Sequence, residues 1–562
     1  MQEKRWYIPP PLPPETDKAL QGYPPVLRQI LYNRGYASAE AARRFLEALP
    51  PADTSPFQLT DLEKAAARVQ HAIERGEPIV VYGDYDVDGI SATALLLDFL
   101  QAAGGRATPY IPHRFDEGYG LNQDAIRHLS EQGAALIIAV DCGIRSLAEA
   151  DLARQLGTDL IICDHHHPGE TLPQALAVID PKRAGDAYPE KNLAGVGVAY
   201  KLACGIAQKM GLPDELLSPL LDLVALGTVA DLVPLSGENR SLVRQGLARL
   251  RRPQRQGLLS LMGVAGIKPQ RLTATDIGFA LGPRLNAAGR LDTAMDALAL
   301  LIASDVYQAA RLAQQLDVQN RHRQKLTQTI QEQAEALALE GDPEAFLLFA
   351  AHPSFNAGVV GLAASRLVER HYRPAIVGQQ DAEYTRASCR SIPEFHITEA
   401  LDACSDLLEK YGGHAAAAGF TVRNEKLPEL VTRLKSLAAE KLAGEDLRPT
   451  LTADLEIQLT DLKPEILEYL DWLQPTGYGN PAARFVSRGV RVLSQRAVGS
   501  ERNHLKLVVS DGYITFDAIA FRQGHWADRL PPQIDLLYRF ELNEFRGRKS
   551  LQLNVLDIKP SA

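Results

Sequence analysis

The sequence predicts an α/β protein whose largest domain is a doubly wound, mainly parallel sheet. Between residues 78 and 182, short continuous apolar runs alternate with segments of helical length. Such runs are typical of strands that helices cover on both faces, and the alternation is typical of parallel sheets. The chain has 562 residues, 46% of them hydrophobic and 23% charged. This is the composition of a globular protein, and the length indicates about three or four domains.

Each element of this domain is indicated by its own apolar pattern. Strands are expected at residues 79–82, 107–111, 135–140, 159–163 and 175–179. Helices are expected between them, at residues 91–103, 124–132 and 147–156. Residues 290–340 contain neither glycine nor proline and carry apolar residues near helical spacing. A long helix, whole or broken once, is therefore expected there.

The pattern changes again further along the chain. A second α/β stretch begins near residue 344, and short strands with turn signals after Leu447 indicate a small β-barrel or sandwich. We therefore divide the chain into five parts. They are an N-terminal lead-in (1–60), an α/β domain (61–300), a linking helix (301–340), a second α/β domain (341–446) and a β-domain (447–562).

Charge and cysteine content indicate the cellular compartment of the protein more than its function. The net charge of -9 argues against wholesale coating of nucleic acid, although a local basic groove is compatible with it. The N-terminus has basic residues but no apolar segment of signal-peptide type. Five scattered cysteines fit free thiols in a reducing compartment. We expect a cytoplasmic protein that does not bind a membrane.

Three aspartates follow the first strand of the large domain. Asp84, Asp86 and Asp88 alternate directly after the apolar run. On an extended chain, alternate residues point to one face, so these carboxylates would crowd together. A divalent cation among them would offset the cost of burying several acids. The alternative is that they cap the loop into the following helix.

More acids and imidazoles follow later strands. Asp141 ends the third predicted strand, and Asp164, His165 and His166 end the fourth. Asp231 interrupts a further apolar stretch. The carboxyl ends of parallel strands share one edge, so these side chains would meet in one crevice. A cap or turn role is the alternative for each residue alone, but their recurrence at strand ends favours a shared metal site.

Together these stretches resemble the four motifs of the DHH phosphoesterase superfamily. The motifs are Asp84-Tyr-Asp86-Val-Asp88, Val140-Asp141-Cys-Gly143, Asp164-His165-His166 and Val229-Ala-Asp231. The glycine-rich stretch 412–420 resembles the substrate-binding domain associated with that superfamily. Stretches 282–290, 358–366, 389–392 and 477–481 resemble one branch, the RecJ single-strand-specific exonucleases.

The resemblance implies two divalent ions, Mn²⁺ or Mg²⁺, that serve phosphodiester hydrolysis. Asp141 would bridge the ions. One site would be completed by Asp84 and Asp86, and the other by Asp88, His165 and Asp231. Many superfamily members have a histidine where this chain has Tyr82, and Asp84 would substitute for it.

Two neighbouring residues have implied roles beside the ions. His166 would contact the scissile phosphate and stabilise its developing charge, the alternative being a structural histidine. Asp164 would orient a neighbouring imidazole.

The resemblance also implies residues that hold the substrate. Gly412, Gly413 and Gly419 would let the backbone approach a phosphate, with His414 and Arg390 as contacts. Three further arginines are candidates for a phosphate track, although single arginines are more often solvated or paired with acids. They are Arg284, Arg290 and Arg366.

The β-domain would be an OB-fold that binds a single strand by stacking and charge. The candidate contacts are Tyr538, Phe545, Arg546, Arg548 and Lys549. The alternative is a plain hairpin with a basic turn.

The family implies a 5′ to 3′ exonuclease that releases 5′-mononucleotides from single-stranded DNA in recombination and repair. It also implies single-stranded-DNA-binding protein as a partner, and we expect a monomer. Two other functions stay open. One is a phosphodiesterase for short oligonucleotides or cyclic dinucleotides, and the other is a non-enzymatic replication or repair scaffold of the same fold.

Overall fold

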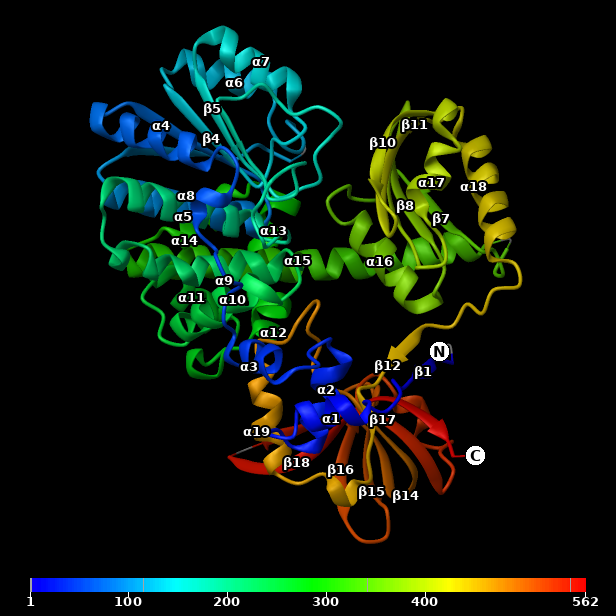
Figure 1. Ribbon diagram of the computed structural model, residues 1–562. Helices are drawn as coiled ribbons and strands as arrows, with labels where there is room; N and C mark the ends of the chain where they lie inside the picture. Colours follow the sequence, from blue (N-terminus) through cyan, green and yellow to red (C-terminus); the bar gives the residue numbers. More distant parts are fainter. Residues whose placement is uncertain (1–2, 115, 341, 546, 562) are drawn as a thin grey trace. The chain divides into compact units, whose positions relative to one another are not determined.

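The computed structural model describes residues 3–114, 116–340, 342–545 and 547–561. The chain forms two compact units. One unit consists of Tyr7–Asp317 and Thr452–Ala562, and the other of Met1–Trp6 and Val318–Leu451. In Figure 1 the first unit is coloured blue to green and orange to red, because it combines an early and a late segment of the chain.

The first unit contains a parallel sheet in the order β3-β2-β4-β5-β6. Its strands are β3 (Arg106–Tyr110), β2 (Pro78–Gly83), β4 (Leu136–Val140), β5 (Asp159–Cys163) and β6 (Ala177–Ile179). Helices cover both faces (Figure 1). One face carries α6 (Gln123–Glu131) and α7 (Leu147–Leu156), and the other carries α4 (Leu62–Arg75), α5 (Val87–Ala102) and α8 (Gly195–Met210). The predicted doubly wound parallel sheet is confirmed.

The strands serve both faces because successive residues point in opposite directions. In β4, Ile137 and Ala139 belong to the core beneath α6 and α7. Leu136, Ile138 and Val140 belong to the core on the side of α5 and α8. A strand buried on both sides therefore reads as a continuous apolar run.

The helix after β2 begins earlier than expected. We predicted its start at residue 91, whereas α5 begins at Val87 with Asp86 as its N-cap. The Asp86 carboxylate accepts hydrogen bonds from the N–H groups of Asp88 (2.9 Å) and Gly89 (3.2 Å). The expectation that Asp84, Asp86 and Asp88 alternate along one extended strand is therefore wrong, and the cap alternative holds for Asp86.

A helical layer follows the sheet. It comprises α9 (Leu221–Ala230), α10 (Gly237–Leu250), α11 (Gln256–Val264), α12 (Ala274–Asp276), the π-helix η5 (Ile277–Leu281), α13 (Gly282–Leu291), α14 (Met295–Leu301) and α15 (Val306–Leu339). The helix predicted within 290–340, whole or broken once, is broken twice, at 292–294 between α13 and α14 and at 302–305 between α14 and α15. No helix in the described part of the chain, α15 included, has the length and apolarity that a bilayer span requires.

The second unit has a mixed sheet in the order β10-β11-β9-β8-β7. Only β7 and β8 pair in parallel. The strands are β7 (Leu348–His352), β8 (Ala375–Gln380), β9 (Tyr384–Arg390), β10 (Leu408–His414) and β11 (Ala417–Arg423). The helices are α16 (Val360–His371), α17 (Ile397–Asp402) and α18 (Leu427–Leu442).

The last part of the chain is a closed β-barrel. Its strands follow the order β13-β14-β15-β16-β18-β17, and β17 pairs with β14 to close the ring. They are β13 (Leu455–Glu456), β14 (Phe485–Val498), β15 (His504–Ser510), β16 (Thr515–Ala520), β17 (Gln533–Phe545) and β18 (Arg548–Pro560). The predicted OB-like barrel is confirmed, and α19 (Glu465–Trp472) lies between β13 and β14 in the chain.

The N-terminal lead-in belongs to the barrel. It forms α1 (Pro14–Ala19), α2 (Pro25–Asn33) and α3 (Ala39–Glu47). Leu27, Ile30 and Phe45 from these helices share one apolar core with Phe485 and Ile534 of the barrel. This packing joins residues from the two ends of the sequence.

Candidate active site

The acids predicted at the sheet edge meet there. Asp84 follows β2, Asp141 follows β4, and Asp164, His165 and His166 follow β5. Two further acids reach the same place from α5, Asp86 at its N-cap and Asp88 in its first turn. The last, Asp231, is the C-cap of α9. Strand ends and helix ends together build the cluster.

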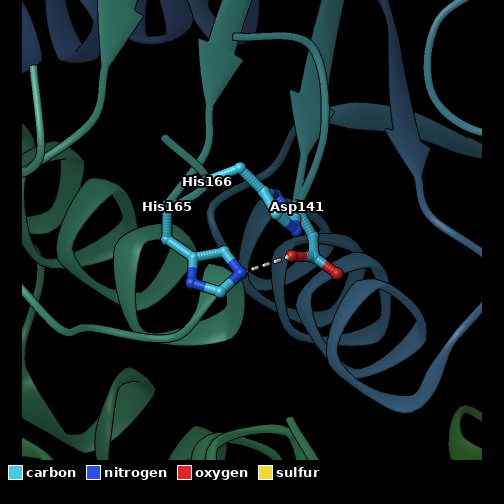
Figure 2. Close-up of side chains that lie close together, drawn as sticks. All are labelled: Asp141, His165 and His166. Carbon is cyan, nitrogen blue, oxygen red and sulfur yellow. Dashed lines mark ion pairs between the residues drawn. The ribbon is translucent and has the colours of Figure 1, made fainter. Parts of the chain in front are cut away.

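Asp141 lies at the centre of this cluster. Its backbone N–H donates to the carbonyl of Cys163 (2.9 Å) in the neighbouring strand, and its φ of 61° is left-handed. Its Oδ1 lies 3.1 Å from Nε2 of His165, and Figure 2 shows the His165 ring pointing at the Asp141 carboxylate. A Cβ on Gly195 would come within 2.5 Å of the same oxygen, so this carboxylate needs the glycine.

Asp88 is held by the start of α8. Its carboxylate accepts hydrogen bonds from the N–H groups of Gly195 (2.6 Å) and Val196 (2.9 Å). The positive end of a helix dipole favours a carboxylate in this place. A Cβ on Gly227 of α9 would come within 2.6 Å of Asp88 Oδ1. Helices α8 and α9 therefore fix this side chain from two sides.

The carboxylate and imidazole atoms of the cluster form groups of three residues that are close enough together to bind one cation. Asp84, Asp86 and Asp141 form one group, and Asp88, His165 and Asp231 form another. Within each group the atoms lie within 4.8 Å of one another. A third group joins Asp141 and His165 to His166, which the sequence analysis placed beside the metals and not among their ligands.

Burial and mutual repulsion raise the pKa of the acids in the cluster. Burial raises the pKa of Asp84 and Asp88 well above the usual value, and the nearby carboxylates raise it further. The same two causes act on Asp141. Burial and Asp86 raise the pKa of Asp231 to about 7. Without a cation, this arrangement of acids opposes its own ionisation.

The donor set fits one or two divalent cations. Asp141 Oδ1 and His165 Nε2 lie 3.1 Å apart without forming a hydrogen bond, and Asp84 Oδ1 is likewise buried without a hydrogen-bond partner. Burial lowers the pKa of His165 to about 3, which keeps its imidazole neutral and able to ligate. Buried polar atoms are normally paired, so these atoms lack a partner that a cation would supply. Carboxylates with one imidazole suit Mn²⁺ and Mg²⁺.

The Asp164 carboxylate holds both histidines in place through hydrogen bonds. Its carboxylate accepts hydrogen bonds from the N–H groups of His165 (2.7 Å), His166 (3.2 Å) and Ile144 (2.9 Å). It also contacts Nδ1 of His166 at 2.7 Å. Burial opposes the charge of this pair, but the hydrogen bond prevails and raises the pKa of His166 to about 9. His166 is therefore a cation beside the acids.

Two residues at the site, Tyr119 and Asp180, were not predicted from the sequence. Tyr119 lies on a loop between two glycines, and its hydroxyl reaches Nδ1 of His166 (3.3 Å) and the carbonyl of Asp141 (3.4 Å). Asp180 directly follows β6, and its Oδ2 is buried without a hydrogen-bond partner. Burial raises the pKa of Asp180 to about 7. The strand-end rule that found Asp141 would also have found Asp180.

The arginines proposed for a phosphate track have protein partners. Arg284 donates from Nε to Asp317 (2.9 Å) and from Nη1 to the carbonyl of Ala280 (2.8 Å). Arg290 lies near enough to Tyr85 to lower the pKa of its hydroxyl, although burial raises that pKa to about 12 overall. Arg284 is thus positioned first as a structural residue of α13.

The other substrate-binding candidates lie in the second unit. Arg366 donates to Gln331 at 3.4 Å, and Arg390 donates to the carbonyl of Cys389 at 2.8 Å. His414 pairs with Ala417, which pairs with Arg390 across three strands. This register brings His414 and Arg390 to the same end of the sheet.

The glycines of this stretch have different surroundings. A Cβ on Gly413 would collide with the backbone of Ala418 in β11, whereas a Cβ on Gly412 would meet nothing within 4 Å. Gly419 is paired with Gly412. Gly413 is therefore required by strand packing, and Gly412 is the one with space in front of it.

The candidates on the barrel are divided. Tyr538 is fully buried and its hydroxyl contacts Ser487 Oγ at 2.8 Å, so the prediction that it stacks on DNA is wrong. Lys549 is exposed. Arg546 and the side chains of Phe545 and Arg548 lie outside the described residues. The aromatic at 538 was misjudged because an alternating strand does not show which face is inside.

Three family models match this chain, each over one part. The DHH family N-terminal domain matches residues 78–228, the DHHA1 domain matches residues 344–440, and the RecJ OB domain matches residues 453–557. A curated relative, the single-stranded-DNA-specific exonuclease RecJ of Salmonella typhimurium, is 38% identical over 97% of this chain and 98% of its own length. The chain belongs to the RecJ family.

Other RecJ proteins support the assignment. The single-stranded-DNA-specific exonuclease RecJ of Bacillus subtilis is 39% identical over 95% of this chain and 68% of the relative. The crystal structure of RecJ from Thermus thermophilus in complex with Mn²⁺ has a TM-score of 0.86 and 32% identity. It matches 99% of this chain and 80% of that chain. A second RecJ structure from the same organism, in complex with Mg²⁺, has a TM-score of 0.80 and 30% identity, and covers 99% of this chain and 79% of that chain.

Proposed function

We propose that this protein is a metal-dependent exonuclease that degrades single-stranded DNA from its 5′ end and releases 5′-mononucleotides. The observation that carries the proposal is the pair of ligand groups at the sheet edge, Asp84–Asp86–Asp141 and Asp88–His165–Asp231. The names of the RecJ relatives support the substrate, and the Mn²⁺ and Mg²⁺ complexes of the Thermus protein support the metals.

Each of the two ligand groups would bind one cation. Asp141 lies between the groups, since its Oδ1 is 3.1 Å from His165 while its side chain also belongs with Asp84 and Asp86. When bound, a pair of divalent ions supplies Lewis-acid chemistry that polarises a phosphodiester and activates water. The unpaired oxygens of Asp84 and Asp141 are the atoms that such ions would satisfy.

The residues around the ligands prepare the site for a phosphate. Asp164 holds the ring of His166 through Nδ1 and keeps it protonated, so His166 carries positive charge toward a developing negative charge. Tyr119 restrains the same ring through its hydroxyl. The start of α8 keeps Asp88 in its ligating position.

The barrel supplies the binding surface for a single strand in this proposal. OB-folds bind single strands by stacking and charge, and the RecJ OB model matches this part of the chain. One chain contains both ligand groups, so a monomer suffices for the reaction. A single-stranded-DNA-binding protein as partner, a role in recombination and repair, and a cytoplasmic location are supported by the family likeness alone.

The test uses purified protein with Mn²⁺ or Mg²⁺ and Asp141→Ala as the control variant. The substrates are single- and double-stranded DNA labelled at the 5′ or the 3′ end, and oligonucleotides of two to four residues. We expect mononucleotides released from the 5′ end of single strands by the wild type alone. Release from the 3′ end only would refute the polarity, and cleavage of the short substrates only would favour an oligonucleotide phosphodiesterase. An inactive wild type would favour a scaffold.

A further inference from the structure

A loop that leads into the barrel packs directly on the segment that carries Asp231. This barrel loop is defined as Leu473–Asn480. The N–H of Leu235 donates to the carbonyl of Tyr478 (2.8 Å). A Cβ on Gly479 would lie 2.8 Å from Cβ of Pro234, and a Cβ on Gly477 would lie 2.8 Å from Cδ1 of Leu235. At Gly479 an added methyl group would have to displace Pro234, whereas at Gly477 it would meet the end of the Leu235 side chain.

The barrel loop is held by a buried arginine of the catalytic domain. Arg240 of α10 is 1% exposed. Its guanidinium donates to four carbonyls of the loop and its approach, those of Trp472 (3.1 Å), Leu473 (2.9 Å), Gln474 (2.8 Å) and Pro475 (3.2 Å). It also donates to the carbonyl of Phe45 (2.8 Å) in α3. A buried charge with five acceptors holds the loop in one conformation.

The other end of the loop is fixed by Asn480. Its Nδ2 donates to the carbonyls of Leu473 (2.9 Å) and Pro475 (2.7 Å), and Arg34 of the N-terminal helices donates to its Oδ1. The backbones of Gly477 and Asn480 also pair with each other. These contacts give the loop one defined conformation, although it lies outside any strand or helix.

The contact reaches the metal site through a short and constrained path. Asp231 caps α9, and Leu232 directly after it adopts a left-handed φ of 62°. Pro234 follows, and its carbonyl accepts a hydrogen bond from Asn239 (3.2 Å). Its other side meets Gly479. Asp231 Oδ2 lies 3.6 Å from Nε2 of His165, so a small displacement of this segment would move one ligand of the group.

We propose that the barrel loop positions Asp231, so that the C-terminal domain completes the Asp88–His165–Asp231 site. This inference rests on the proposed metal-dependent function. It makes Arg240 and Gly479 positioning residues, which touch neither metal nor DNA. The barrel loop should affect only one of the two metal sites. The Asp84–Asp86–Asp141 group lies at the ends of β2, α5 and β4 and has no part in the contact with the loop.

The experiment titrates Mn²⁺ into the full chain without DNA and follows free Mn²⁺ by electron paramagnetic resonance. The variant is Gly479→Ala, whose added methyl meets Pro234. The matched control is Gly512→Ala, a barrel glycine with φ of 98° and nothing within 4 Å of a Cβ. We expect two bound ions in the wild type and the control. In Gly479→Ala, one ion should bind at least about tenfold more weakly, as for other residues that support a metal ligand, and the other should be unchanged.

A second variant covers the case in which Gly479→Ala does not fold. Gly477→Ala has no left-handed φ and meets only the flexible end of Leu235. We expect a smaller loss of affinity at the same ion, because the Leu235 side chain can partly give way, and Leu235→Val in the same chain should restore the affinity by making room. A purely structural role would weaken both ions together and lower the melting temperature.

The outcomes separate the inference from the function on which it rests. A wild type that binds no Mn²⁺ would refute the proposed function. Two ions bound with unchanged affinity in folded Gly479→Ala and Gly477→Ala would overturn the positioning role and leave the function intact.

Discussion

Replacing Asp141 by asparagine should stabilise the metal-free protein and remove most of the stabilisation that metal provides. Asp141 is buried, its Oδ1 has no hydrogen-bond partner, and its pKa is raised by burial and by the neighbouring carboxylates. An asparagine has nearly the same shape, carries no charge, and can donate to a neighbouring acid. Relief of one unsatisfied buried group is worth about 1–3 kcal/mol. The metal-free variant should therefore unfold at a temperature about 2–12 °C above the metal-free wild type.

The effect of metal has the opposite sign. At a free Mn²⁺ concentration of 100 times the dissociation constant, each ion stabilises the folded wild type by about 2.7 kcal/mol. Two ions would raise its melting temperature by about 11–22 °C, at about 2–4 °C for each kcal/mol in a domain of this kind. Asp141→Asn should lose at least half of this rise because the carboxylate belongs to one ligand group and lies 3.1 Å from His165 of the other.

The assay is differential scanning calorimetry with EDTA and with Mn²⁺. The control is Asp124→Asn, an exposed position at the start of α6. It should change the free energy of unfolding by no more than about 0.5 kcal/mol, both with EDTA and with Mn²⁺. A metal-free Asp141→Asn that melts below the metal-free wild type would refute the account of repulsion in the cluster. Equal shifts with Mn²⁺ in both proteins would refute the bridging role.

Three further predictions concern the surroundings of the site. Arg284→Gln should lower stability by about 1–3 kcal/mol because it removes the pairing with buried Asp317, and the salt dependence of DNA affinity should stay unchanged; a slope reduced by about 1 would instead indicate a phosphate contact. Gly413→Ala should unfold the second unit in circular dichroism, whereas Gly412→Ala should fold normally and weaken DNA binding; equal melting curves would contradict the assigned packing. Tyr119→Phe should lower kcat and leave KM unchanged in steady-state assays; a change in KM alone would place the hydroxyl in substrate binding.

The sheet and most of its site could be predicted because the signals are local. Asp141 follows a short apolar run whose length and isoleucine content favour a covered strand, and the position of strand ends along one sheet edge then places it beside His165. The start of α5 was misplaced for a related reason. Asp86 is an acid at a strand end, which indicates a ligand, and also a helix cap, and sequence alone does not separate the two roles.

What could not be predicted depends on contacts between distant segments. The N–H groups of Gly195 and Val196 hold Asp88 from more than 100 residues away, 107 and 108 positions along the chain. No local pattern announces such a pairing. Tyr538 shows the same limit in the barrel, because its burial depends on which face of β17 points into the barrel core.

The shared core of the N-terminal helices and the barrel has a consequence for synthesis. Leu27, Ile30 and Phe45 emerge from the ribosome before their partner Phe485, which follows 440 residues after Phe45. Because synthesis proceeds at about 5–20 residues per second, the apolar faces of these helices stay exposed for on the order of a minute before the barrel can cover them. During that time they are a natural target for chaperones. A shortened chain meant to isolate the barrel should therefore keep residues 7–60 with it.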